Sequence, residues 1–169
     1  MSFIRWLNKR GWYALILMAA ATSAVAQAPV TPQSQTPDDL TAIRIAAENF
    51  LRALDDLDWE PFQASWATDP TVFFPFADTP DRVTGRAAVE ARWRRFFEQA
   101  RGRRPGPPYL QIRPRDLRVD RYGDVGLVTF TFEGLPELQG QLARRTLVLV
   151  LERGAWKVVH VHASALGQR

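Results

Sequence analysis

The chain contains only two histidines, His160 and His162, which stand two residues apart near its C-terminal end. Arg145 lies upstream of them and Ser164 follows. A guanidinium can bind a carboxylate through two parallel hydrogen bonds, and an imidazole gains or loses a proton near neutral pH. These residue types therefore predict a site that binds an anion or transfers a proton.

A β-hairpin would bring these residues together. If the dipeptide Arg153-Gly154 forms a two-residue turn, Arg145 stands opposite His162. Directly opposed residues share a sheet face, as do residues two apart on one strand, so His160 and Ser164 join that face. Nearer the turn the same face is apolar, with Leu147, Leu149, Leu151, Trp156 and Val158. An apolar surface that ends in polar groups is typical of a small-molecule pocket.

Each of these side chains also has a structural interpretation. In an acid–base enzyme of the isomerase, cyclase or hydrolase type, His162 would be the catalytic base. In the alternative, both imidazoles hydrogen-bond to buried backbone groups or to each other. Arg145 would hold an anionic ligand, or it would pair with a loop acid such as Glu133 or Glu137. The sequence leaves these alternatives open.

Two tryptophans, Trp66 and Trp93, are predicted to line the cavity, because an indole adds a polar N–H to an apolar ring. No metal site is predicted, since the H-x-H pair supplies only two of the ligands that zinc requires. The sequence contains neither a G-x-S-x-G nucleophile elbow nor a glycine-rich nucleotide loop. We therefore predict no cofactor.

The apolar periodicity predicts helices first and strands afterwards. Steps of three and four residues predict a long helix from Thr36 to about Asp56, a short one from Asp58, and a third that Thr84 caps. A turn is expected at residues 68–70. The expected strands are 71–74, 109–122 (broken near Pro114), 125–133, 141–152 and 155–165. This order indicates an α+β fold with helices packed on one antiparallel sheet.

The reverse face of the C-terminal hairpin is apolar as well, with Val148, Val150, Val159, Val161 and Ala163. A sheet covered by helices on one side only would leave its other face polar. Burial of both faces is achieved if helices cover one and a second subunit covers the other. The pattern therefore predicts a homodimer through the sheet.

The N-terminal residues have the layout of a secretory signal peptide. Three cations precede a short apolar stretch, and Ala24-Val25-Ala26 provides the cleavage site. We assign residues 1–26 to the leader, with cleavage after Ala26 or Ala28, residues 27–37 to a disordered linker and residues 38–166 to the domain. The expected location is periplasmic or secreted. An uncleaved anchor is the alternative, and the only basis for a membrane contact.

Charge and cysteine content exclude several classes of function. The formal charge is +4, and removal of the three leader cations leaves +1 (4 minus 3), so we expect no nucleic-acid partner. An arginine-rich run over residues 92–104 is interpreted as a solvated helix face and tail. Cysteine is absent, which excludes disulfides, thiolate metal sites and a cysteine nucleophile.

The hairpin sequence resembles a known family. Arg145-Thr146, followed by the strand Trp156 to Ser164 with its W-x-x-V-H-x-H-x-S pattern, is similar to the C-terminal hairpin of SnoaL-like proteins in the nuclear transport factor 2-like superfamily. The association domain of calcium/calmodulin-dependent kinase II, a relative within the superfamily, has the same pattern. Asp58-Trp59-Glu60 and Thr84-Gly85-Arg86 resemble the family's first helix junction and third helix start.

The resemblance implies a cone-shaped, curved antiparallel sheet of four to six strands, wrapped around a long N-terminal helix, with two further helices and a pocket at the mouth. Such domains include enzymes, binding modules and assembly modules, and dimers through the sheet are common among them, so the fold alone does not fix the function. The tyrosine, acid and aspartate trio of ketosteroid isomerases has no counterpart in this sequence. We therefore expect a small, partly apolar and anionic ligand in the pocket, with enzyme and assembly roles as alternatives.

Overall fold

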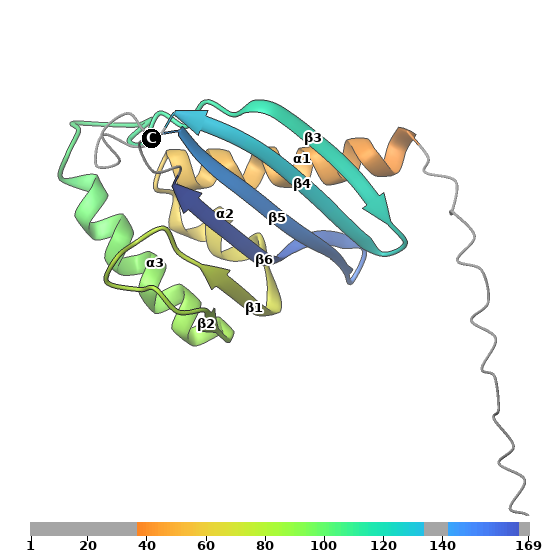
Figure 1. Ribbon diagram of the computed structural model, residues 1–169, viewed down its shortest axis with the longest axis horizontal. Helices are drawn as coiled ribbons and strands as arrows, with labels where there is room; N and C mark the ends of the chain where they lie inside the picture. The colour runs from red at the N-terminus through yellow and green to blue at the C-terminus, as the bar shows by residue number, and fades with distance from the viewer. Residues whose placement is uncertain (1–36, 134–141, 166–169) are drawn as a thin grey trace, which may run out of the picture. The chain divides into compact units, whose positions relative to one another are not determined.

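A computed structural model describes residues 37–133 and 142–165 of the chain (Figure 1). The predicted leader, residues 1–26, and all but the last residue of the predicted linker lie outside the described residues. Among the residues that are described, no helix is both long and apolar enough to cross a membrane.

Three helices form where the apolar periodicity predicts them. They are α1 (Pro37–Asp55), α2 (Trp59–Ala64) and α3 (Arg86–Arg101). Two aspartates in the first turn of α1 and an arginine in its last turn complement the helix dipole. The first residue of α3 follows Gly85, whose φ of +87° a side chain would strain. Gly85 is therefore the N-cap, and the prediction that Thr84 caps this helix is wrong, since Thr84 belongs to a strand.

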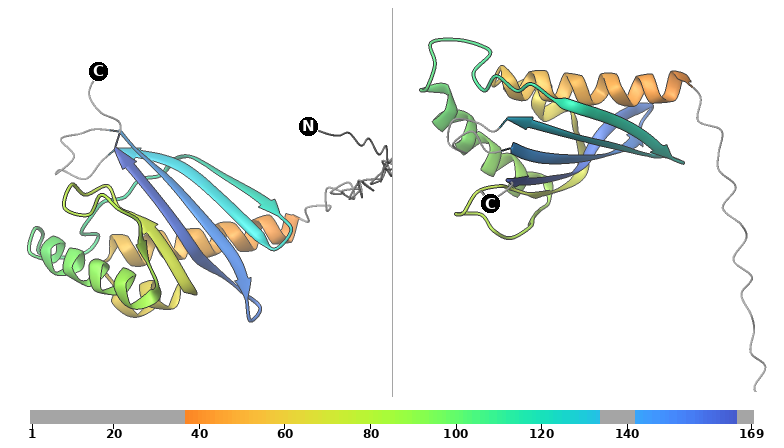
Figure 2. Two further views of the ribbon diagram at one scale, coloured as in Figure 1. Left: turned by 60° about the horizontal axis from the view of Figure 1, so that its bottom comes forward. Right: turned by 45° about the horizontal axis from the view of Figure 1, so that its top comes forward.

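Six strands make one sheet, in the order β2-β1-β6-β5-β4-β3. They are β1 (Trp66–Phe73), β2 (Val83–Thr84), β3 (Arg115–Tyr122), β4 (Val125–Glu133), β5 (Leu142–Glu152) and β6 (Ala155–Ala165). The pairs from β3 to β6 are antiparallel, as predicted, but β1 runs parallel to β6. Helix α1 crosses one face of the curved sheet (Figure 2), which confirms the α+β fold class.

The predicted turn at residues 68–70 is wrong, because β1 passes through it. The register of β1 against β6 shifts between Trp66 and Thr71. Pro70 has no N–H to donate to a ladder, and it falls in this irregular stretch, where a regular ladder is interrupted. The turn residues of the sequence therefore mark a break in pairing within one strand.

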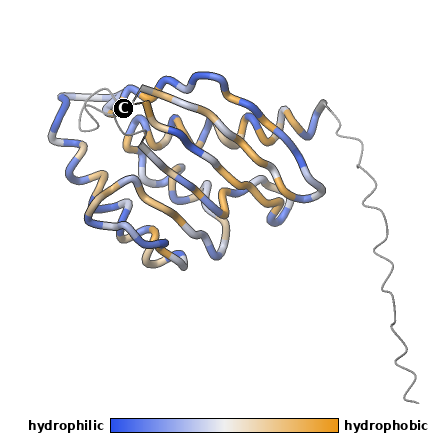
Figure 3. The backbone as a smooth tube through the Cα atoms, in the orientation of Figure 1, coloured by the Kyte–Doolittle hydropathy of each residue, from blue (hydrophilic) through white to orange (hydrophobic). Residues whose placement is uncertain are grey.

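The core lies between α1 and the inner face of the sheet. Along the strands, apolar residues alternate with polar residues (Figure 3). Helix α1 contributes Ile43, Ala47 and Phe50, which are almost fully buried. The helix comes so close to β4 that a Cβ on Gly126 would lie 2.9 Å from Ile43 Cγ2. Glycine at this position therefore permits the close approach of helix and sheet.

The C-terminal hairpin contains a bulge that reverses the predicted faces. Pairing follows the prediction from the turn as far as Leu149 opposite Val158. Val148 then pairs with His160, so Val159 is an extra residue on β6. A one-residue slip moves every later side chain to the other face. The bulge brings Val161 into the core beside Val158, where two histidines would otherwise be buried.

The predicted convergence of Arg145 with the histidines is therefore wrong. Arg145 pairs with Ala163 and lies on the inner face, whereas His162 pairs with Thr146 on the outer face. Ser164 pairs with Arg144 and shares the outer face. The same slip corrects the predicted reverse face, because Val161 and Ala163 are buried with the core and do not share a face with Val148 and Val150.

Candidate functional site

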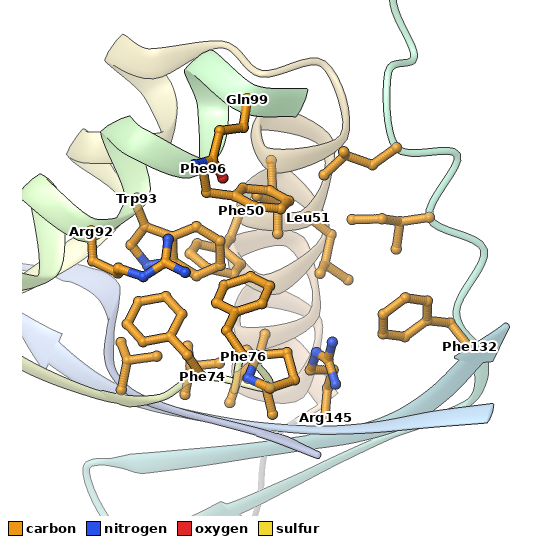
Figure 4. A pocket seen from close by; sticks show the side chains of 18 of the residues that line it. Phe50, Leu51, Phe74, Phe76, Arg92, Trp93, Phe96, Gln99, Phe132 and Arg145 are labelled. Atoms are coloured by element: carbon orange, nitrogen blue, oxygen red, sulfur yellow. The ribbon is translucent and has the colours of Figure 1, made fainter. Parts of the chain in front are cut away.

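A cavity of about 370 Å³ opens between α1, α3 and the inner face of the sheet. Its volume lies at the lower end of the range for small-molecule pockets. Most of its wall is apolar (Figure 4). The apolar part includes Phe50, Leu51, Leu54, Val72, Phe74, Phe76, Trp93, Phe96, Leu110, Ile112, Phe130, Phe132, Leu147 and Val161. The polar side chains in the wall are Asp78, Arg92, Gln99, Arg103 and Arg145.

Arg145 brings a positive charge into this apolar wall from β5. Its Nη1 donates to the carbonyl oxygens of Arg144, at 2.7 Å, and Ser164, at 3.3 Å. The guanidinium lies over the ring of Phe132, 4.7 Å from its centroid. No carboxylate among the described side chains pairs with it, and the predicted partners Glu133 and Glu137 lie outside those side chains. Burial lowers the pKa of Arg145 to about 10, so the group remains charged at neutral pH.

A second guanidinium, that of Arg92, enters the wall from α3. The side chain is only 7% exposed, and its guanidinium lies over the rings of Phe74 and Phe76, at 5.3 Å and 4.4 Å from their centroids. Its Nε donates to Thr79 Oγ1 at 2.9 Å, and its Nη2 donates to Asp78 Oδ1 at 3.1 Å. These bonds fix the loop between β1 and β2, residues 74–82, as one wall of the pocket.

The acid that Arg92 contacts lies at the surface. The Asp78 side chain is 73% exposed. A hydrogen bond from Thr79 lowers the pKa of Asp78, and the nearby Arg92 lowers it further. Asp78 is therefore ionised at neutral pH and compensates the charge of Arg92. Arg145 has no such compensation among the described side chains.

The six residues predicted for the site separate into three groups. Arg145 and Trp93 line the pocket. Trp66 is buried in the core against Phe50 and Phe62, outside the pocket wall. The other three, His160, His162 and Ser164, lie on the outer face of the sheet. Whether Arg145 and Trp93 contact a ligand remains a prediction.

The outer-face histidines have structural contacts of their own. His160 Nδ1 lies 2.7 Å from Thr71 Oγ1, and both imidazoles pack against the ring of Phe73. Partial burial lowers the pKa of His160, and the nearby charges of His162 and Arg82 act in the same direction. Within residues 37–133 and 142–165 there is no cluster of three or more metal-binding side chains. His162 does not line the pocket between α1, α3 and the sheet, so that pocket does not bring a substrate to its imidazole.

Sequence analysis did not identify the β1–β2 loop or Arg92 as parts of the pocket. Arg92 belonged to a run of arginines interpreted as a solvated face, although it is buried. One signal could have separated it from its neighbours. Arg92 occurs three residues after Val89 and four before Phe96, which places it on the apolar stripe of α3.

A family comparison agrees with this architecture. The profile of the SnoaL-like domain matches residues 43–167, most of the chain. The chain belongs to the SnoaL-like domain family. Among curated protein sequences, none matches this SnoaL-like chain.

Solved structures of nuclear transport factor 2-like and cystatin-like proteins have folds similar to that of the SnoaL-like domain. A candidate dehydratase of the former family from Streptomyces avermitilis is 24% identical, with 79% of this chain and 100% of that chain covered and a TM-score of 0.65. A cystatin-like fold protein from Burkholderia xenovorans is 22% identical, with 79% of this chain and 96% of that chain covered and a TM-score of 0.60. A candidate ketosteroid isomerase from Shewanella frigidimarina is 19% identical, with 73% of this chain and 94% of that chain covered and a TM-score of 0.59. At these identities the likeness shows the fold alone.

Proposed function

We propose that this SnoaL-like domain binds a small carboxylic acid with an apolar body in the pocket between α1, α3 and the sheet. The observation that carries the proposal is the Arg145 guanidinium, which lies in an apolar wall without a carboxylate partner among the described side chains. A mostly buried cation is costly unless an anion or hydrogen-bond acceptors compensate it. A bound carboxylate would supply that compensation through the free side of the guanidinium.

The surroundings of the pocket also favour an anion. Residues 99–115 carry five arginines and no acid, and this segment contributes Gln99, Arg103, Leu110 and Ile112 to the pocket wall. Excess positive charge near a binding cleft attracts anions and accelerates their association. The apolar rings of the wall would pack against the hydrocarbon body of the acid. The pocket therefore suits a ligand with one charged end and an apolar body.

Binding of matched ligands tests the proposal. Calorimetric titration with octanoate and its neutral amide should show about tenfold or more tighter binding of the acid, because a hydrogen bond to a charged group is worth about 1.5–3 kcal/mol. Arg145→Gln should remove this difference. Arg144→Gln changes the adjacent arginine on the outer face and should leave the difference intact. Equal binding of acid and amide by the unmodified domain would contradict the proposal.

A second candidate function is self-association through the outer face of the sheet. The specific observation is that apolar residues remain accessible there: Val125 pairs with Tyr122 on one side and Val150 on the other, so the three share a face. Tyr122 is 64% exposed. A second copy of the domain would cover this face by a twofold arrangement. Light scattering measures the mass in solution and distinguishes a dimer from a monomer.

The enzyme alternative has less support from the geometry. An acid–base reaction in the pocket requires a proton-transfer group within reach of the substrate. Asp78 is the only carboxylate among the described lining residues, and it is exposed and paired with Arg92. The proposal therefore assigns binding, not proton transfer, to this pocket.

A further inference from the structure

Two of the three guanidiniums in the pocket wall, those of Arg145 and Arg92, differ in charge compensation. Arg145 comes from the sheet and Arg92 from α3, with phenyl rings between them (Figure 4). Arg92 already has the carboxylate of Asp78 at 3.1 Å, whereas no described carboxylate reaches Arg145. Arg145 therefore presents an uncompensated cation to the pocket and Arg92 a compensated one, on different walls.

Arg92 retains hydrogen-bonding capacity after its contacts with the loop. Its Nε and Nη2 bind Thr79 and Asp78, and in the described part of the chain we find no acceptor for Nη1. The Nη1 atom is also absent from the fully buried, unpartnered side-chain atoms, which comprise only the indole nitrogens of Trp66 and Trp93 among the described residues. The side chain is only 7% exposed and the residue lines the cavity, so a molecule in the pocket could accept a hydrogen bond from the remaining donor.

We infer that the ligand is bifunctional: an apolar acid that places its carboxylate on Arg145 and a second, uncharged oxygen on Nη1 of Arg92. This inference rests on the proposed function and narrows it to keto or hydroxy acids. A neutral carbonyl or hydroxyl oxygen satisfies the Nη1 donor without adding charge. A second carboxylate at Arg92 would be repelled by Asp78, which lies against the same guanidinium.

The order of affinities within a ligand series tests this assignment. The probes are straight-chain monocarboxylates of about six to ten carbons, a range suited to a small pocket, with oxo acids and dicarboxylates of equal length. At the best length, the oxo acid should bind at least about tenfold more tightly than the plain acid, which is the usual effect of one hydrogen bond to a charged group. The dicarboxylate should bind no more tightly than the plain acid.

Asp78→Asn provides the decisive variant. It removes the negative charge from Arg92 at an exposed position, so the fold should persist, and a melting curve verifies this. The dicarboxylate should then gain at least about tenfold in affinity and displace the oxo acid as the preferred ligand. Asp81→Asn, a change of the same type in the same loop, should leave the original order unchanged.

The outcomes separate this inference from the proposed function. If plain acids bind in an Arg145-dependent manner but oxo acids show no preference at any length, the role of Arg92 is overturned while the carboxylate site stands. An unchanged order in Asp78→Asn likewise overturns the charge argument. If no acid binds at any length, both proposals are wrong.

Discussion

At the residue scale, the proposed function depends mainly on the guanidinium of Arg145. Arg145 makes two hydrogen bonds to main-chain oxygens and one ring contact, which orient the guanidinium without neutralising it. Arg92 and Asp78 show the compensated arrangement in the same pocket. An ion pair already satisfied within the protein has little affinity left for an external anion. For this reason the carboxylate is assigned to Arg145 and not to Arg92.

His160 leads to a pH-dependent prediction. Its pKa is lowered in the folded domain, chiefly by burial, whereas the unfolded chain has the ordinary value of about 6.5. Below that value the unfolded state binds more protons, so the free energy of unfolding should fall as the pH drops through about 6.5. The loss should stay under about 1 kcal/mol, because the ring is partly solvated.

Urea unfolding at several pH values measures this effect. His160→Gln should flatten the decline between about pH 7 and pH 5, the interval that contains the ordinary histidine pKa. His162→Gln alters the exposed neighbour in the same strand and should have a smaller effect. A decline of equal slope in the unmodified domain and in His160→Gln would contradict the assignment.

At the scale of elements, the contact between α1 and β4 depends on a glycine. A Cβ on Gly126 would lie 2.9 Å from Ile43 Cγ2, and Ile43 is fully buried in the core. Gly126→Ala should therefore lower the free energy of unfolding by about 1–3 kcal/mol, as overpacking does. Gly102→Ala is the control, since a Cβ there meets nothing within 4 Å and the backbone is helical.

The double variant Ile43→Ala with Gly126→Ala distinguishes overpacking from other causes. Removing the Ile43 side chain leaves room for the new methyl group. The double variant should therefore lose less free energy of unfolding than the sum of the losses in the two single variants. Strict additivity in urea unfolding would mean that the close approach at Gly126 does not determine the cost.

Sequence patterns located most of the elements, but they missed β2, the first half of β1 and the register of one pairing, and they began the strand of β3 too early, at residue 109. The three- and four-residue periodicity located α1 and α3, and alternation located β4, β5 and β6. Pairing near the Arg153-Gly154 turn was also correct, because a two-residue turn fixes the local register. The register was wrong beyond Val159, since alternation alone does not reveal a bulge.

The error at the bulge had a physical cause that the sequence contains in part. Val158 and Val161 are three apart, so a regular strand could bury only one of them on a given face. The bulge buries both and leaves His160 and His162 outside. The preference for valine in the core over histidine was a usable signal. The pocket role of Arg92 depends on the path of the β1–β2 loop, which no local pattern specifies.

At the scale of the whole molecule, the two faces of the sheet differ in their surroundings. The inner face forms the core and the pocket, while the outer face combines the histidines with valines. Val148 lies at the centre of this outer face, between Leu127 on β4 and His160 on β6. On this face Leu127 pairs with Val148 and Val125 pairs with Val150, and such apolar pairs on neighbouring strands are unusual for a face exposed to water. We therefore propose that a second copy covers it.

Charge substitutions on the two sides of the domain test this dimer. In a twofold interface, Val148→Glu would place two like charges close together and should give a monomeric mass by light scattering at micromolar concentration. Tyr122→Glu, at a more exposed position of the same face, should weaken the dimer if Val148→Glu impairs folding. Ile45→Glu introduces the same charge on α1, at a residue that is 52% exposed, and should leave the dimer intact. A monomeric unmodified domain, or a dimer that Ile45→Glu alone disrupts, would show that the outer face is not the interface.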